Sequence, residues 1–239
     1  MEIRKHIPNF ITSMNAVCGI IGVVFAFRGR IDIAFCLMIA AGVFDFCDGF
    51  AARSLGAYSD MGKELDSLCD LVSFGVLPSI MLYTEMRACS FGETWLCWVP
   101  LLITVFSALR LAKFNIDERQ TSGFLGLPTP ACALLVGALC QYVCHDPSCF
   151  LAMWLAGPVF GPALTVCLCA LLVCEIPMFS LKIHKDDPRS LKDKRLAFAF
   201  LVLAAVLVCV ICRLNWSLAV LIVMTCYILK NVIYRIFNI

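Results

Sequence analysis

Eight long apolar stretches run through this 239-residue sequence, and they limit its possible folds more than any other feature. They cover roughly residues 9–27, 31–53, 66–86, 95–114, 127–145, 158–181, 196–212 and 215–236. A helix needs about 20 mostly apolar residues to cross a bilayer, where every backbone polar group must be paired within the protein. We therefore expect an all-α, polytopic membrane helix bundle with about eight transmembrane helices, forming a single integral membrane domain over residues 1–239.

The distribution of basic residues predicts how this bundle is oriented. Alternation of eight spans leaves few basic residues on one side of the membrane, namely Arg28, Arg30, Arg87 and Arg213. The other side receives the remaining ones, including the mixed-charge loop 182–195 and the residues near both ends of the chain. Lysine and arginine accumulate in cytoplasmic loops. We therefore expect both termini in the cytoplasm and a multi-pass protein of the cell (inner) membrane.

Composition excludes several other classes of protein. Hydrophobic residues make up 62% of the chain and charged residues 15%, against about 25% charged in soluble domains. The formal net charge of +2 gives no support for a nucleic-acid partner. Most of the 16 cysteines lie inside the apolar stretches, so we interpret them as small apolar fillers rather than disulfides or zinc ligands.

Four aspartates stand where the second apolar stretch ends and the third begins. Asp45 and Asp48 share a helix face at spacing i, i+3, and Asp66 and Asp70 share one at i, i+4. An aspartate at the centre of a spanning helix costs about 2.5–3.5 kcal/mol, so charged residues within spans are functional candidates. We expect the four carboxylates to converge at the cytoplasmic boundary of the membrane.

Such a cluster needs positive charge, because neighbouring carboxylates cannot all stay ionised in a low-dielectric setting without compensation. Oxygen-only ligands suit Mg²⁺ or Mn²⁺, and two such ions can clamp a diphosphate during displacement. The small residues Gly49 and Ala52 would let a nucleotide approach the helix backbone closely, and Arg53 would meet phosphate oxygens. The pattern therefore predicts a two-metal site for a substrate that carries a diphosphate.

From Asp45 to Asp70 the sequence reads DxxDGxxARx(8)GxxxDxxxD, which resembles the signature of the CDP-alcohol phosphatidyltransferase family at every fixed position. The resemblance implies a membrane enzyme that transfers a phosphatidyl group from a CDP-activated lipid to a small alcohol. It implies that Asp45, Asp48 and Asp66 hold the metals and that Asp70 is both a metal ligand and the general base. Implied contacts to the CDP-lipid are Asn9, Thr12, Gly49, Ala52, Arg53, Ser59 and Gly62.

Four further segments, Ile7–Thr12, Asp66–Pro78, Arg110–Asn115 and Gly126–Ala131, resemble the bacterial and archaeal members of this family that use L-serine as acceptor and form phosphatidylserine from CDP-diacylglycerol. The resemblance reaches from about residue 7 to 131, which we take as the catalytic core, with additional spans over about 132–239. A serine carboxylate needs cationic and neutral hydrogen-bond partners. Our candidates for them are Lys63, Ser73, Arg110, Lys113, Asn115 and Thr129. The resemblance also implies a homodimer.

Three alternatives stay open at this point. Another member of the family would use the same metals with a different acceptor, forming phosphatidylglycerol phosphate or an inositol lipid. A cation transporter would place the aspartates at mid-membrane, but it leaves Gly49, Ala52 and Arg53 without an evident use. A membrane scaffold associating through small residues leaves the aspartate spacing unexplained. Metal-dependent release of CMP separates the enzyme from the other two classes.

Overall fold

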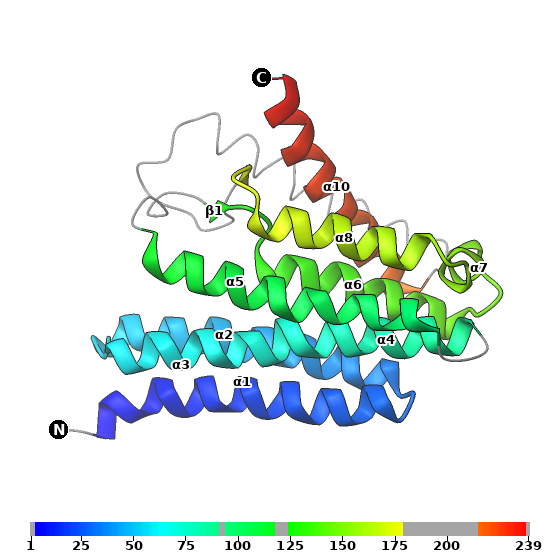
Figure 1. Ribbon diagram of the computed structural model, residues 1–239. Helices are drawn as coiled ribbons and strands as arrows, with labels where there is room; N and C mark the ends of the chain where they lie inside the picture. The colour runs from blue at the N-terminus through cyan, green and yellow to red at the C-terminus, as the bar shows by residue number, and fades with distance from the viewer. Residues whose placement is uncertain (1–2, 91–93, 118–123, 179–214, 238–239) are drawn as a thin grey trace.

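The computed structural model describes residues 3–90, 94–117, 124–178 and 215–237, which form a bundle of helices (Figure 1). Its α-helices are α1 (Ile3–Phe27), α2 (Ile31–Leu55), α3 (Asp60–Asp70), α4 (Leu77–Cys89), α5 (Leu102–Ile116), α6 (Thr129–His145), α7 (Phe150–Ala156), α8 (Phe160–Val173) and α10 (Trp216–Phe237). A π-helical segment, η1 (Leu71–Val76), joins α3 to α4, and a 3-10 helix, η2 (Trp95–Leu101), leads into α5. The two-residue strands β1 (Phe124–Leu125) and β2 (Pro177–Met178) pair antiparallel.

Helices occupy most of each predicted apolar stretch that is described, but in the stretch 158–181 the helix ends at Val173 and the chain continues into the strand β2. Within the described residues, five segments are long and apolar enough to cross a membrane: His6–Phe27, Ile31–Leu55, Asp60–Cys89, Trp95–Ile116 and Trp216–Ile233. The pair α7 and α8, bent by 89°, would make a sixth span, and α6 is a shorter apolar helix. The helical, multi-pass fold class is thus confirmed. The stretch 196–212 and the loop 182–195 lie outside the described residues, so the number eight and the orientation of the termini stay predictions.

The core of the bundle is centred on α6, which packs against α2, α4, α8 and α10. Gly137 lets α2 come close, because a Cβ at this position would clash with Phe35 and Met38. Phe35 in turn stacks on Trp216 of α10, with ring centroids 5.2 Å apart. The cysteines of the described residues are free thiols, and Cys132 and Cys140 are buried in α6. Cys36 and Cys167, by contrast, are exposed on their helices, and Cys209 lies outside the described residues, so the interpretation as apolar fillers of the bundle holds for only some of the cysteines.

The outer faces of α1 and α2 carry large apolar side chains that the described bundle leaves exposed. They include Phe10, Val17, Ile20, Val24, Val43, Phe46 and Phe50. Such a continuous apolar face fits contact with lipid chains rather than with water.

A tight link between α2 and α3 positions the predicted site. Gly56 ends α2 in the left-handed conformation, at φ 59°, and its backbone N–H donates to the carbonyl of Arg53. Glycine adopts this conformation at no steric cost. Ser59 then caps α3, its Oγ accepting a hydrogen bond from the backbone N–H of Gly62 at 3.0 Å. The chain therefore turns back after α2, and α1 packs against both α2 and α3.

Candidate active site

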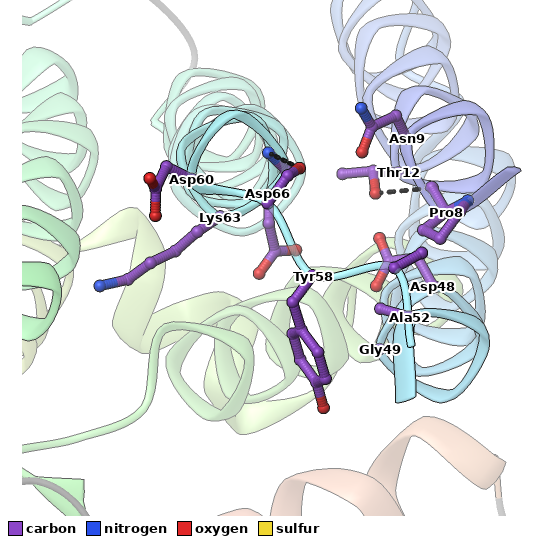
Figure 2. A pocket seen from close by; sticks show the side chains of 13 residues that line it. Pro8, Asn9, Thr12, Asp48, Gly49, Ala52, Tyr58, Asp60, Lys63 and Asp66 are labelled. Carbon is purple, nitrogen blue, oxygen red and sulfur yellow. Dashed lines mark hydrogen bonds between the residues drawn. The ribbon is translucent and has the colours of Figure 1, made fainter. Parts of the chain in front are cut away.

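A cavity of about 530 Å³ lies where α1, α2 and α3 meet, within the usual size range of ligand pockets. Its lining consists of Pro8, Asn9, Thr12, Asp48, Gly49, Ala52, Ala57, Tyr58, Ser59, Asp60, Gly62, Lys63 and Asp66. Figure 2 shows Asp48 and Asp66 entering the same space from two different helices. Asn9 and Thr12 approach it from α1. The cavity therefore brings together side chains that lie more than 50 residues apart in the sequence.

Three of the four predicted aspartates form an acidic cluster at this cavity. Ligand oxygens of Asp45, Asp48 and Asp66 all lie within 4.8 Å of one another. Asp48 is 6% exposed, and the other two are half-buried. Three carboxylates this close repel one another unless a cation lies between them.

The donor set of this cluster fits a hard divalent cation. It offers oxygen atoms only, as Mg²⁺ and Mn²⁺ prefer. In addition, Oδ2 of Asp48 is buried and has no hydrogen-bond partner within the described part of the chain. Buried polar atoms are nearly always paired, so an orphaned carboxylate oxygen facing two other carboxylates is suited to a metal ion.

Asp70, the fourth aspartate, lies one turn further along α3 and is not part of the group of three. Its Oδ1 accepts a hydrogen bond from Nδ2 of Asn15 on α1 at 3.0 Å. Directly after Asp70 the chain changes from an α-helix to the π-helical segment η1. The sequence reasoning missed Asn15. The sequence does offer a sign of it, because Asn15 is a polar amide inside the first apolar stretch. Polar residues within spanning segments are functional candidates, as the aspartates are.

The residues predicted to contact the CDP-lipid lie around the cavity. Six of them line it: Asn9, Thr12, Gly49, Ala52, Ser59 and Gly62. The seventh, Arg53, is exposed, and its guanidinium nitrogens lie 4.0 Å from where a Cβ at Gly49 would stand. Tyr58 and Asp60 also line the cavity and were not predicted; they flank the predicted Ser59 in the eight-residue gap of the motif, which specifies no residue type.

Five of the six predicted acceptor residues fall into two groups, and the first group, Lys63 and Asn115, connects the cavity to α5. Lys63 lines the cavity, and its Nζ donates to the backbone carbonyl of Asn115 at 3.1 Å. Nδ2 of Asn115 donates to Oγ of Ser67 at 2.9 Å. These two hydrogen bonds join the first turns of α3 to the end of α5.

The second group, Arg110, Lys113 and Thr129, is not among the residues that line the cavity. Arg110 is 7% exposed, and its Nη1 donates to Oγ1 of the fully buried Thr129 at 2.8 Å. Its guanidinium also lies over the ring of Phe114, 5.5 Å from the centroid. Lys113 instead forms an exposed ion pair with Glu175 at 3.3 Å.

Ser73, the remaining acceptor candidate, is fully buried in η1. Its Oγ donates to the backbone carbonyl of Asn15 at 2.9 Å. The hydroxyl of Ser73 therefore joins η1 to α1.

Comparison with known proteins gives a consistent result. A Bacillus subtilis protein named CDP-diacylglycerol–serine O-phosphatidyltransferase is 42% identical over 127 residues, which is 53% of this chain and 70% of that protein. A protein of the same name from Methanocaldococcus jannaschii is 37% identical over 145 residues, 59% of this chain and 65% of its own length. One from Mycobacterium bovis is 32% identical over 210 residues, 84% of this chain and 70% of its own length.

The curated relatives are matched over only part of their length, which ranges from 54% to 70%. The model of the CDP-alcohol phosphatidyltransferase family matches residues 5–161. This region extends past residue 131, the predicted end of the catalytic core, so the division into core and additional spans stays a prediction. The match covers more than half of the sequence and includes the whole acidic motif, and this chain therefore belongs to the CDP-alcohol phosphatidyltransferase family.

Proposed function

We propose that this protein transfers the phosphatidyl group of CDP-diacylglycerol to L-serine, releasing CMP and forming phosphatidylserine. The observation that carries the proposal is the acidic cluster of Asp45, Asp48 and Asp66 beside a cavity whose lining includes five residues of the family motif: Asp48, Gly49, Ala52, Gly62 and Asp66. The serine acceptor is supported by the name CDP-diacylglycerol–serine O-phosphatidyltransferase, which relatives at 32–42% identity share. The enzyme would be a transferase of phospholipid biosynthesis.

The metal ions of the reaction would be held by the acidic residues of α2 and α3. We assign Asp45, Asp48 and Asp66 to two divalent cations, Mg²⁺ or Mn²⁺, with Asp70 as a further ligand from the next turn. Bound there, the ions would offset the charge that develops on the diphosphate oxygens during displacement. The orphaned Oδ2 of Asp48 supports this assignment.

The nucleotide of the donor would occupy the cavity itself. Gly49 supports this role, because a side chain there meets nothing closer than the Arg53 guanidinium at 4.0 Å and the backbone of α2 is open to a ligand. Asn9, Thr12 and Ser59 supply polar atoms around the same space, and Arg53 supplies a positive charge beside it. The acyl chains would stay among the membrane lipids along the apolar outer faces of α1 and α2.

Asp70 would take the proton from the serine hydroxyl. It is separated from the group of three, and Asn15 holds one of its oxygens. An Asp70→Asn variant should therefore still bind CDP-diacylglycerol while losing transfer, because an amide cannot accept the proton at neutral pH. Unchanged turnover in this variant would remove Asp70 from its role as base.

The serine carboxylate needs a cation, and Arg110 is the best candidate among the predicted ones. Its guanidinium is buried, bonded to Thr129, and so held in one orientation. A planar guanidinium can bind a carboxylate through two parallel hydrogen bonds. Lys63 and Asn115 would help from the side of α3 and α5, where they contact each other.

The active site would face the cytoplasm, where CMP is released. The end of the bundle that holds the cavity also carries Arg53, Lys63 and Lys113, whereas the turn between α1 and α2 at the other end carries Arg28 and Arg30. Lysine and arginine favour the cytoplasmic side. Both termini would then be cytoplasmic, and we expect the enzyme to work as a homodimer in the cell membrane.

A purified-protein assay tests the proposal directly. CMP release is measured with CDP-diacylglycerol and Mg²⁺ or Mn²⁺, with serine, glycerol 3-phosphate and inositol phosphate offered separately. We expect release with serine, and none after chelation of the metal. Release only with glycerol 3-phosphate or inositol phosphate would assign another acceptor, and no release with any of them would overturn the proposal.

A further inference from the structure

Asn15 lies deep in α1, beside the acidic residues but outside the set that lines the cavity. Its side chain is 0% exposed and sits in a segment long and apolar enough to span the membrane. Nδ2 donates a hydrogen bond to Oδ1 of Asp70 at 3.0 Å. An amide that contacts a carboxylate inside a spanning segment requires an explanation, because both groups are costly to bury there.

The backbone around Asn15 is held firmly against the helix that carries Asp70. Ser73 donates a hydrogen bond from Oγ to the carbonyl oxygen of Asn15 at 2.9 Å. One turn further along α1, a Cβ at Gly19 would clash with Oγ of Ser73 and lie 3.0 Å from its Cα. The close approach of α1 and η1 leaves the Asn15 amide little freedom to turn away from Asp70.

The other polar atom of the side chain shows that the amide is not there merely to fill space. Oδ1 of Asn15 is buried and has no hydrogen-bond partner within the described residues. A buried acceptor without a partner destabilises the fold, whereas a leucine of similar size would fill the site without that cost. The reverse orientation of the amide would point an oxygen at the Asp70 carboxylate, so the hydrogen bond to Asp70 determines the arrangement.

We propose that Asn15 is a positioning residue that selects which oxygen of Asp70 acts as the base, an inference that rests on the proposed function. With one lone pair of Oδ1 engaged by Asn15, the acceptor proton goes to Oδ2 of Asp70, and the second lone pair of Oδ1 stays available for the metal ligation proposed above. The O–H bond of the acceptor breaks, and its oxygen bonds to the phosphorus that carries diacylglycerol. The bond from this phosphorus to the bridging oxygen breaks, and CMP leaves with that oxygen. The π-helical segment that begins directly after Asp70 is consistent with a carboxylate set for function, because such segments are frequent at functional sites.

The test compares full-length variants at Asn15 in the CMP-release assay. Asn15→Leu keeps the size of the side chain and removes both polar atoms, and Asn15→Asp keeps the shape and places a second acceptor against Asp70. For both we expect kcat to fall about tenfold or more, since general base catalysis depends on the geometry of the base. The KM for CDP-diacylglycerol and the thermal stabilisation by this lipid should stay within twofold of wild type, because Asn15 does not line the cavity.

Gln141 provides the matched control, because its Oε1 is also buried without a partner in the described part of the chain. It lies on α6, 12 residues beyond Thr129 and therefore about 18 Å from the Arg110 end of that helix. Gln141→Leu should leave kcat and both KM values unchanged.

A merely structural role for Asn15 would give a different result. A kcat within twofold of wild type in both Asn15 variants would overturn the inference about Asn15 and leave the proposed function standing. So would a loss shared equally between the KM for the lipid, kcat and the melting temperature. If the wild-type protein released no CMP with any acceptor, the proposed function and this inference would both fall. If Asn15→Leu does not fold, the isosteric Asn15→Asp carries the test by the same criteria.

Discussion

The side of the site proposed for the nucleotide and the side proposed for the acceptor are built differently. On the nucleotide side, most of the predicted residues of α1, α2 and α3 line one cavity, and Oδ2 of Asp48 has no partner in the described structure. On the acceptor side, the predicted residues of α5 and α6 are bonded to other residues of the chain. These bonds join Arg110 to Thr129, Lys113 to Glu175 and Asn115 to Ser67.

This difference separates two kinds of residue. Residues of the first kind can bind a ligand directly. Residues of the second kind already have a hydrogen-bond partner in the chain, and they bind a ligand either while keeping that partner or after releasing it. A buried hydrogen bond can preorganise a binding group, as in the Arg110–Thr129 pair. An exposed ion pair does so poorly, since water and salt screen it. The comparison therefore predicts a ranking of effects, with the acidic cluster first and Lys113 last.

The largest effect is expected at Asp48, the buried member of the acidic cluster. Asp48→Asn removes a charge where three carboxylates lie within 4.8 Å, and we expect CMP release to fall about 10³-fold or more. Asp32→Asn is the control, because Asp32 lies on the same helix and forms only an exposed ion pair with Arg30. It should stay within twofold of wild type. Equal losses in both variants would show that the cluster has no special role.

The second effect concerns the acceptor side. Arg110→Leu should raise the KM for serine about 10- to 100-fold, because charge-assisted hydrogen bonds contribute about 1.5–3 kcal/mol. The KM for CDP-diacylglycerol should stay within twofold, since Arg110 does not line the cavity. Arg87→Leu, at an exposed position near the end of α4, is the control and should change neither constant. A parallel rise of both constants in Arg110→Leu would contradict a role in acceptor binding.

The nucleotide side was largely predictable from sequence because its residues follow helical spacing over a short distance. Asp45 and Asp48 lie on one face of α2, and the turn at Gly56 returns the chain so that Asp66 meets them. Spacing alone could not separate Asp70 from the group of three. The i, i+4 relation indicates that Asp66 and Asp70 share a helix face, but not which of them lies level with Asp45 and Asp48 along the helix axis. The partners on the acceptor side could not be predicted either. The contact between Lys113 and Glu175, 62 positions apart, depends on how α5 packs against α8.

Gly49 tests whether the cavity is the nucleotide site, with a smaller expected effect. In Gly49→Ala the new Cβ would come no closer than 4.0 Å to the Arg53 guanidinium, so no clash within the protein is expected. The helix itself should gain up to about 1 kcal/mol from the alanine. The KM for CDP-diacylglycerol should nevertheless rise about tenfold, because the methyl group enters the cavity.

Gly42→Ala is the matched control for Gly49→Ala. Gly42 lies on the same helix, does not line the cavity, and a Cβ there would make an ordinary contact of 3.7 Å with Phe74. Melting temperatures and the KM for CDP-diacylglycerol are measured for both variants. We expect similar stabilities and a raised KM in Gly49→Ala alone. If the two variants had the same KM, the cavity would not be where the nucleotide binds.

The smallest effect is expected at Lys113, which shares α5 with Arg110 but differs from it in surroundings. The side chains of Lys113 and Glu175 are 42% and 62% exposed, and exposed pairs of this kind contribute about 0–1 kcal/mol. Lys113→Gln should therefore change the KM for serine by about twofold at most. An increase as large as that of Arg110→Leu would mean that Lys113 leaves Glu175 to bind the serine carboxylate. In that case Glu175→Gln should lower the KM for serine, because it would release the lysine from its competing partner.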